Sequence, residues 1–107
     1  MVREISATDL AGQLADPASA PVLVDVREPW EWQLAHIDGS VHLPMNLIPL
    51  RMNELPDDRP LVVICHHGVR SYQVGLYLSS AGFDDVASLK GGVEAWATQV
   101  DSTMARY

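Results

Sequence analysis

Apolar runs too short to be helices alternate with segments of helical periodicity along almost the whole chain, and this alternation constrains the fold most. The runs typical of strands are 2–5, 22–26, 40–43, 61–64 and 86–89. Helical spacing or helix-start signals follow them at 6–14, 28–32, 47–55, 71–82 and 93–100. Strands and helices in this order pair in parallel, with helices on both faces of the sheet. We therefore expect an α/β fold of three layers around a central, mostly parallel, five-stranded sheet.

The length of 107 residues fits one compact domain that can bury a core without disulfides. We find no internal repeat, low-complexity tract or linker. We expect a single domain over 1–107, with its core at about 2–100. The short tail at 101–107 carries no strong periodicity, and we expect it to fray.

The charge balance of the chain indicates which classes of partner are disfavoured. Seven Lys and Arg stand against fourteen Asp and Glu, a net charge of −7, and the basic residues form no run. This pattern disfavours nucleic acid as a partner. No stretch approaches the ~20 apolar residues of a membrane span, and the opening residues lack a signal-peptide core. We expect a cytoplasmic protein that does not bind membranes.

The segment 65–71 is the strongest pointer to chemistry. Cys65, the only cysteine, directly follows the apolar run 61–64, and helical spacing begins at Ser71. The junction of a strand end with a helix N-terminus is where α/β folds bind anions, since free amides and the helix dipole stabilise negative charge. Cys65 is therefore positioned to be a nucleophilic thiolate.

Four motifs resemble those of single-domain rhodaneses, in the same order and over nearly the whole chain. They are Asp25-Val26-Arg27-Glu28, His36-Ile37-Asp38-Gly39-Ser40, the loop from Cys65 to Arg70, and Gly91-Gly92-Val93-Glu94-Ala95-Trp96. The resemblance implies a rhodanese-like α/β domain and sulfur transfer. In that family the loop cysteine takes the outer sulfur of thiosulfate or another sulfane donor, holds it as a persulfide, and passes it to cyanide or a thiol. The matching residue is Cys65.

The rest of the loop suits a persulfide anion. We expect backbone amides to surround the terminal sulfur, with Gly68 permitting the tight curl. The substrate-binding residues are expected to be His66, His67, Gly68, Val69, Arg70 and Ser71. Arg70 would add a fixed positive charge that meets an anionic donor. The two histidines would either assist the anion or supply only backbone N–H groups.

Two residues outside the loop are expected to support it. Asp25 and Arg27 end a central strand at the same sheet edge as Cys65, and we expect them to brace the loop by hydrogen bonds or an ion pair. A metal site of Cys65, His66 and His67 lacks the usual zinc spacing, so we expect no metal and no cofactor.

Two alternatives remain open. A persulfide carrier or interaction module, loaded by a partner protein, would have the same loop, so a protein sulfur donor or acceptor is as admissible as a small molecule. A phosphatase or arsenate reductase of this fold is disfavoured, because related enzymes have five residues between cysteine and arginine. Here there are four between Cys65 and Arg70.

Overall fold

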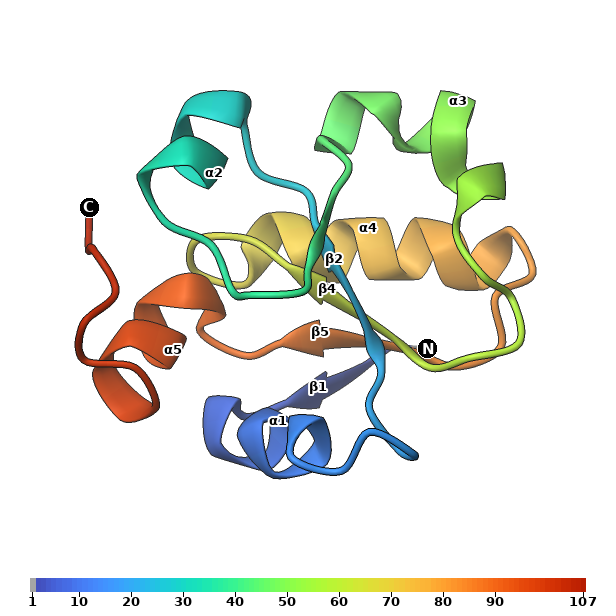
Figure 1. Ribbon diagram of the computed structural model, residues 1–107. Helices are drawn as coiled ribbons and strands as arrows, with labels where there is room; N and C mark the ends of the chain where they lie inside the picture. The colour runs from blue at the N-terminus through green and yellow to red at the C-terminus, as the bar shows by residue number, and fades with distance from the viewer. Residues whose placement is uncertain (1) are drawn as a thin grey trace.

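The computed structural model describes residues 2–107, which build one five-stranded sheet flanked by helices (Figure 1). The strands are β1 (Arg3–Ile5), β2 (Val22–Asp25), β3 (Val41–His42), β4 (Leu61–Ile64) and β5 (Val86–Leu89). The helices are α1 (Ala7–Leu14), α2 (Pro29–Leu34), α3 (Ile48–Arg51), α4 (Val69–Ser80) and α5 (Gly92–Gln99). The strand order is β1-β5-β4-β2-β3, and each neighbouring pair is parallel. The predicted α/β class is confirmed.

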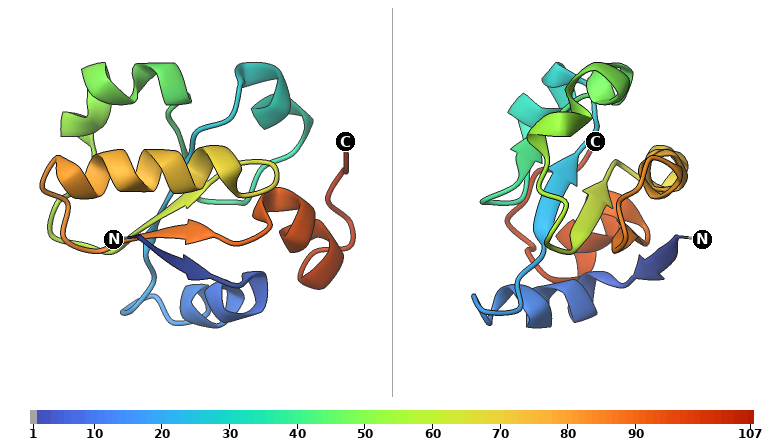
Figure 2. Two further views of the ribbon diagram at one scale, coloured as in Figure 1. Left: turned by 180° about the vertical axis from the view of Figure 1, so that it is seen from behind. Right: turned by 90° about the vertical axis from the view of Figure 1, so that its right-hand side faces the viewer.

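The central strand β4 separates two apolar clusters. Its alternate residues Val62 and Ile64 pack with α1 and α5, while Val63, and Cys65 just after the strand, pack with α3 and α4. This alternation follows from the twofold periodicity of a strand, and it explains why the run 61–64 is apolar throughout. Figure 2 shows the helices on either side of the sheet. Cys65 thus leaves β4 on the α4 side, toward the start of that helix.

The prediction of one helix over 47–55 is wrong in its extent. In its place lie a 3₁₀ turn at Met45–Leu47, the short α3, and a second 3₁₀ turn at Met52–Glu54. Pro49 lies in the first turn of α3, where its missing amide hydrogen is tolerated, and the amides at both ends of the segment bond three residues back, Leu47 N to Pro44 O and Leu55 N to Met52 O. The segment therefore covers the sheet as single turns instead of one regular helix.

The start of α4 and the course of the tail also differ from expectation. Helix α4 begins at Val69 instead of Ser71, because Gly68 with φ of 104° is its N-cap. The tail, expected to fray, folds back on α5. Asp101 N donates to Trp96 O at 2.9 Å, and Arg106 pairs with Glu94. No helix among residues 2–107 is long and apolar enough to cross a membrane.

Candidate active site

The Cys65 thiol sits inside the curl that joins β4 to α4. Its Sγ accepts hydrogen bonds from the amides of Gly68 at 3.0 Å and Ser71 at 3.4 Å. The thiol also donates to Ser71 Oγ at 3.4 Å. The residue is only 1% exposed. The first turn of α4 therefore points backbone donors at the sulfur, as the strand-to-helix junction predicts.

A buried pair of hydroxyls holds this turn in place. Ser71 Oγ donates to Gly68 O at 3.2 Å and lies 2.6 Å from Ser88 Oγ, and both serines are fully buried. Ser88 was not among the predicted site residues. The signal was present, because Ser88 is the only polar residue in the apolar run 86–89.

The start of α5 holds the other side of the loop. Val93 N donates to Cys65 O at 2.9 Å, and Glu94 N donates to His66 O at 3.2 Å. Gly92, with φ of 61°, brings its Cα so close that an added Cβ would overlap both of those carbonyl oxygens. With the carbonyls bound to α5, the loop amides are left free to face the sulfur.

Asp25 and Arg27 form a buried ion pair beside the site. Arg27 Nε and Nη2 donate to both Asp25 oxygens at 2.7 to 3.1 Å, and both side chains are fully buried. Arg27 also donates to Ala35 O at 2.6 Å and to the Tyr107 hydroxyl at 2.9 Å. Burial opposes its charge, but Asp25 and Tyr107 raise the pKa of Arg27 on balance. Within residues 2–107 neither residue bonds directly to the loop, so any bracing is indirect.

Arg70 is not a free charge at the mouth of the loop. Its Nη1 and Nη2 donate to the two oxygens of Glu31 in α2, at 2.7 and 2.9 Å. The Glu31 side chain is 5% exposed and that of Arg70 33%. Burial alone would raise the pKa of Glu31, but hydrogen bonds from Arg70, Tyr107 and the Glu28 amide lower it to about 2. The sequence prediction missed this partner.

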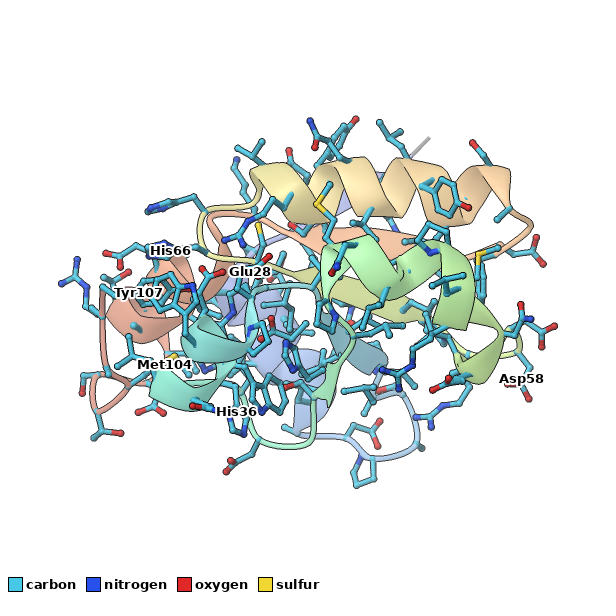
Figure 3. All side chains as sticks on the ribbon, turned by 90° about the horizontal axis from the view of Figure 1, so that it is seen from above. Glu28, His36, Asp58, His66, Met104 and Tyr107 are labelled. Atoms are coloured by element: carbon cyan, nitrogen blue, oxygen red, sulfur yellow. The ribbon has the colours of Figure 1, made fainter. Side chains whose placement is uncertain are left out.

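Two aromatic rings stack on His66, the residue that follows Cys65. His66 stacks on His67 with centroids 3.9 Å apart and on Tyr107 at 3.8 Å. Figure 3 shows His66 and Tyr107 side by side. Burial and the neighbouring His67 lower the pKa of His66, which favours a neutral ring. Among the described residues, His66 Nε2 is the one buried side-chain nitrogen or oxygen that lacks a hydrogen-bond partner.

Comparison with known proteins decides the family. The profile of the rhodanese-like domain matches residues 6–99. The chain belongs to the rhodanese-like domain family. A protein named sulfurtransferase from Allochromatium vinosum is 45% identical over 91% of this chain and 90% of its own length.

Two other similarities agree with the family. The thiosulfate sulfurtransferase GlpE of Pseudomonas syringae is 47% identical over 72% of this chain and 73% of its own length. The crystal structure of a rhodanese-like domain protein from Staphylococcus aureus superimposes with a TM-score of 0.82 at 30% identity, covering 99% of both chains. The predicted family and fold are therefore confirmed for this rhodanese-like domain.

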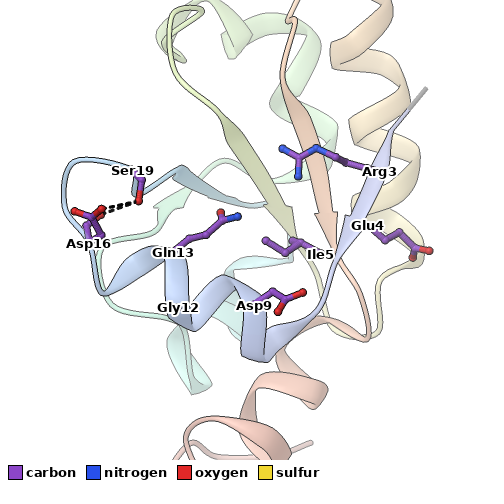
Figure 4. Close-up of a pocket in the computed structure, with 8 residues that line it drawn as sticks. All are labelled: Arg3, Glu4, Ile5, Asp9, Gly12, Gln13, Asp16 and Ser19. Atoms are coloured by element: carbon purple, nitrogen blue, oxygen red, sulfur yellow. Dashed lines mark hydrogen bonds between the residues drawn. The ribbon is translucent and has the colours of Figure 1, made fainter.

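A separate hollow of about 520 Å³ lies beside β1 and α1 (Figure 4). Its lining includes Arg3, Glu4, Asp9 and Asp16, and none of its lining residues belongs to 65–71. Arg3 pairs with Asp85 at 2.6 Å. Among residues 2–107, no group of three or more His, Cys, Asp or Glu side chains is arranged to hold a metal ion.

The Glu31 contacts predict an acid-dependent loss of stability. The pKa of Glu31 falls from 4.5 to about 2 on folding, so its stabilisation is present above about pH 4.5 and is lost as pH falls toward 2. The full shift corresponds to about 3 kcal/mol. We expect the free energy of unfolding of Glu31→Gln, from urea denaturation, to fall about 2 kcal/mol less than that of wild type between pH 6 and 2.5. Equal losses in the two proteins would contradict the assignment.

Proposed function

We propose that this rhodanese-like domain is a sulfurtransferase that carries sulfane sulfur as a persulfide on Cys65. The observation that carries the proposal is the pair of amides, from Gly68 and Ser71, directed at the Cys65 sulfur. Backbone amides carry no net charge, and they stabilise the persulfide anion without favouring one particular acceptor of its sulfur. The names of the similar proteins, sulfurtransferase and thiosulfate sulfurtransferase, support the same chemistry.

The proposed reaction has two stages. The Cys65 thiolate attacks the outer sulfur of thiosulfate, a new S–S bond forms, the bond to the sulfonate sulfur breaks, and sulfite leaves. The amides of 66–71 then hold the persulfide anion. Cyanide or a thiol attacks the terminal sulfur and restores the thiolate. Because the first product leaves before the acceptor binds, we expect ping-pong kinetics.

The surrounding residues have positioning roles in this proposal. Ser71 and Ser88 fix the turn whose amides meet the sulfur. Arg70 orients an anionic donor, in competition with Glu31. Asp25 and Arg27 support the site through Ala35, the C-cap of α2, and through Tyr107. The cycle needs a reduced thiol in each round, so we propose the cytoplasm as the compartment.

The proposal is tested by the intact mass of the reduced protein before and after thiosulfate, and again after cyanide. We expect the mass of one sulfur atom to be added and then removed, with thiocyanate released. The cyanide step distinguishes a persulfide from a sulfinic acid, which has nearly the same added mass but resists cyanide. Loading only from a protein persulfide would favour the carrier role, and hydrolysis of phosphate esters without sulfur loading would favour the phosphatase.

A further inference from the structure

Tyr107 lies beyond the end of α5, yet its ring covers part of the candidate active site. It packs face to face on His66, and because two rings cannot share one face, His66 lies between Tyr107 and His67. The rings of Trp30 and Tyr107 meet edge to face, with centroids 5.6 Å apart. Trp30 itself is 60% exposed. The Tyr107 ring thus covers His66, the residue next to the nucleophile, and the exposed apolar side chain of Trp30 lies beside it.

The phenol oxygen of Tyr107 is held by one hydrogen bond from Arg27, and it orients Glu31 through a second hydrogen bond. Its oxygen accepts from Arg27 Nη1 at 2.9 Å and donates to Glu31 Oε2 at 2.7 Å. Arg27 is fully buried and held by Asp25, so the acceptor side of the phenol has little freedom to move. The chain of contacts runs from a buried ion pair through Tyr107 to Glu31.

Glu31 in turn occupies both Nη atoms of Arg70. A small dianion that binds Arg70 must compete with a carboxylate that is already oriented by Tyr107 and by the amide of Glu28. It must also approach the negative charge of that carboxylate. A donor without a second negative charge meets a smaller penalty, and its carbon chain can pack on Tyr107 and Trp30.

We propose that Tyr107 is a positioning residue that, by holding Glu31 on Arg70, disfavours small dianionic sulfur donors relative to the persulfides of uncharged thiols. The inference rests on the proposed sulfurtransferase function. With such a donor, R–S–SH, the Cys65 thiolate attacks the outer sulfur, the S–S bond of the donor breaks, and the thiolate R–S⁻ leaves. The Cys65 persulfide carries the transferred sulfur and its proton.

The test compares the loading of Cys65 by two donors in wild type and Tyr107→Phe. The donors are thiosulfate and the persulfide of 2-mercaptoethanol, and the rate of loading is followed by quenched-flow mass spectrometry. The phenylalanine ring keeps the stack on His66 but loses both hydrogen bonds. We expect kcat/KM for thiosulfate to rise about fivefold, mainly through a lower KM, because loosening one charged hydrogen bond frees Arg70. We expect less than about a twofold change for the organic persulfide.

Two further variants show whether the effect acts through Arg70. Glu31→Gln should shift the ratio of the two kcat/KM values in the same direction as Tyr107→Phe. In an Arg70→Ala background, Tyr107→Phe should leave the ratio unchanged. Equal changes for both donors would overturn the inference and leave Tyr107 with a structural role. If wild type is loaded by neither donor, the proposed function fails first, and the inference fails with it.

Discussion

Cys65→Ser is expected to abolish sulfur loading while the fold remains. The thiol is the proposed nucleophile and the only cysteine, so no other side chain can replace it. We expect the thiosulfate:cyanide transfer rate to fall by on the order of 10³-fold or more, to the level of the uncatalysed reaction. Serine keeps an acceptor for the amides of Gly68 and Ser71. The unfolding free energy should therefore change by only about 1 kcal/mol.

The measurement combines steady-state thiocyanate formation with urea denaturation of the same samples. Cys65→Ala serves as a second variant, since it removes the hydroxyl as well as the thiol. Full activity in either folded variant would refute the mechanism. Loss of activity with loss of fold in both would show that Cys65 is a core residue first, consistent with its place in the apolar cluster around β4.

Gly92→Ala is expected to disrupt the loop from behind. A Cβ at this position would overlap the carbonyl oxygens of Cys65 and His66, which are backbone atoms and cannot rotate away. The φ of 61° adds strain for any residue with a side chain. We expect a loss of about 3 kcal/mol or more in unfolding free energy, and loss of sulfur transfer in any protein that folds.

Gly39→Ala is the matched control for this variant. Gly39 has a similar φ of 82°, but an added Cβ would meet nothing within 4 Å. It therefore carries the backbone strain without the overlap, and we expect a loss of about 1 kcal/mol with activity retained. If both glycine variants lose equal stability, backbone strain alone explains the loss, and the close contact between Gly92 and the loop carbonyls is unimportant for stability.

Local patterns in the sequence predicted the sheet and the position of Cys65. Apolar runs of strand length and an alternation with helical spacing are properties of neighbouring residues, and so is the junction at 61–71. The same reasoning failed at 47–55, where apolar spacing favours a helix but the backbone closes into successive single turns. Periodicity reports which side chains face the core, and it does not report which carbonyl each amide reaches.

The contacts around Arg70 could not be predicted in the same way. Glu31 and Arg70 are 39 positions apart, and Tyr107 is 76 positions from Glu31, so only the folded topology brings them together. A charged residue beside a glycine-containing loop looks free in the sequence. The tail looked free as well, because a single tyrosine has no periodicity, although its ring and hydroxyl find partners on α2 and the loop.

The pairing of Arg70 with Glu31 also bears on how donors reach this protein. A guanidinium paired with a carboxylate presents a dipole to a distant ion, and the attraction of a dipole falls more steeply with distance than that of a single charge. The whole chain carries a net charge of −7, so an approaching dianion meets overall repulsion at long range. Dissolved salt screens that repulsion, with a Debye length of about 8 Å at physiological ionic strength. The association rate of thiosulfate should therefore increase as salt is added. In an enzyme that attracts its anionic substrate with an unpaired arginine, added salt would lower that rate.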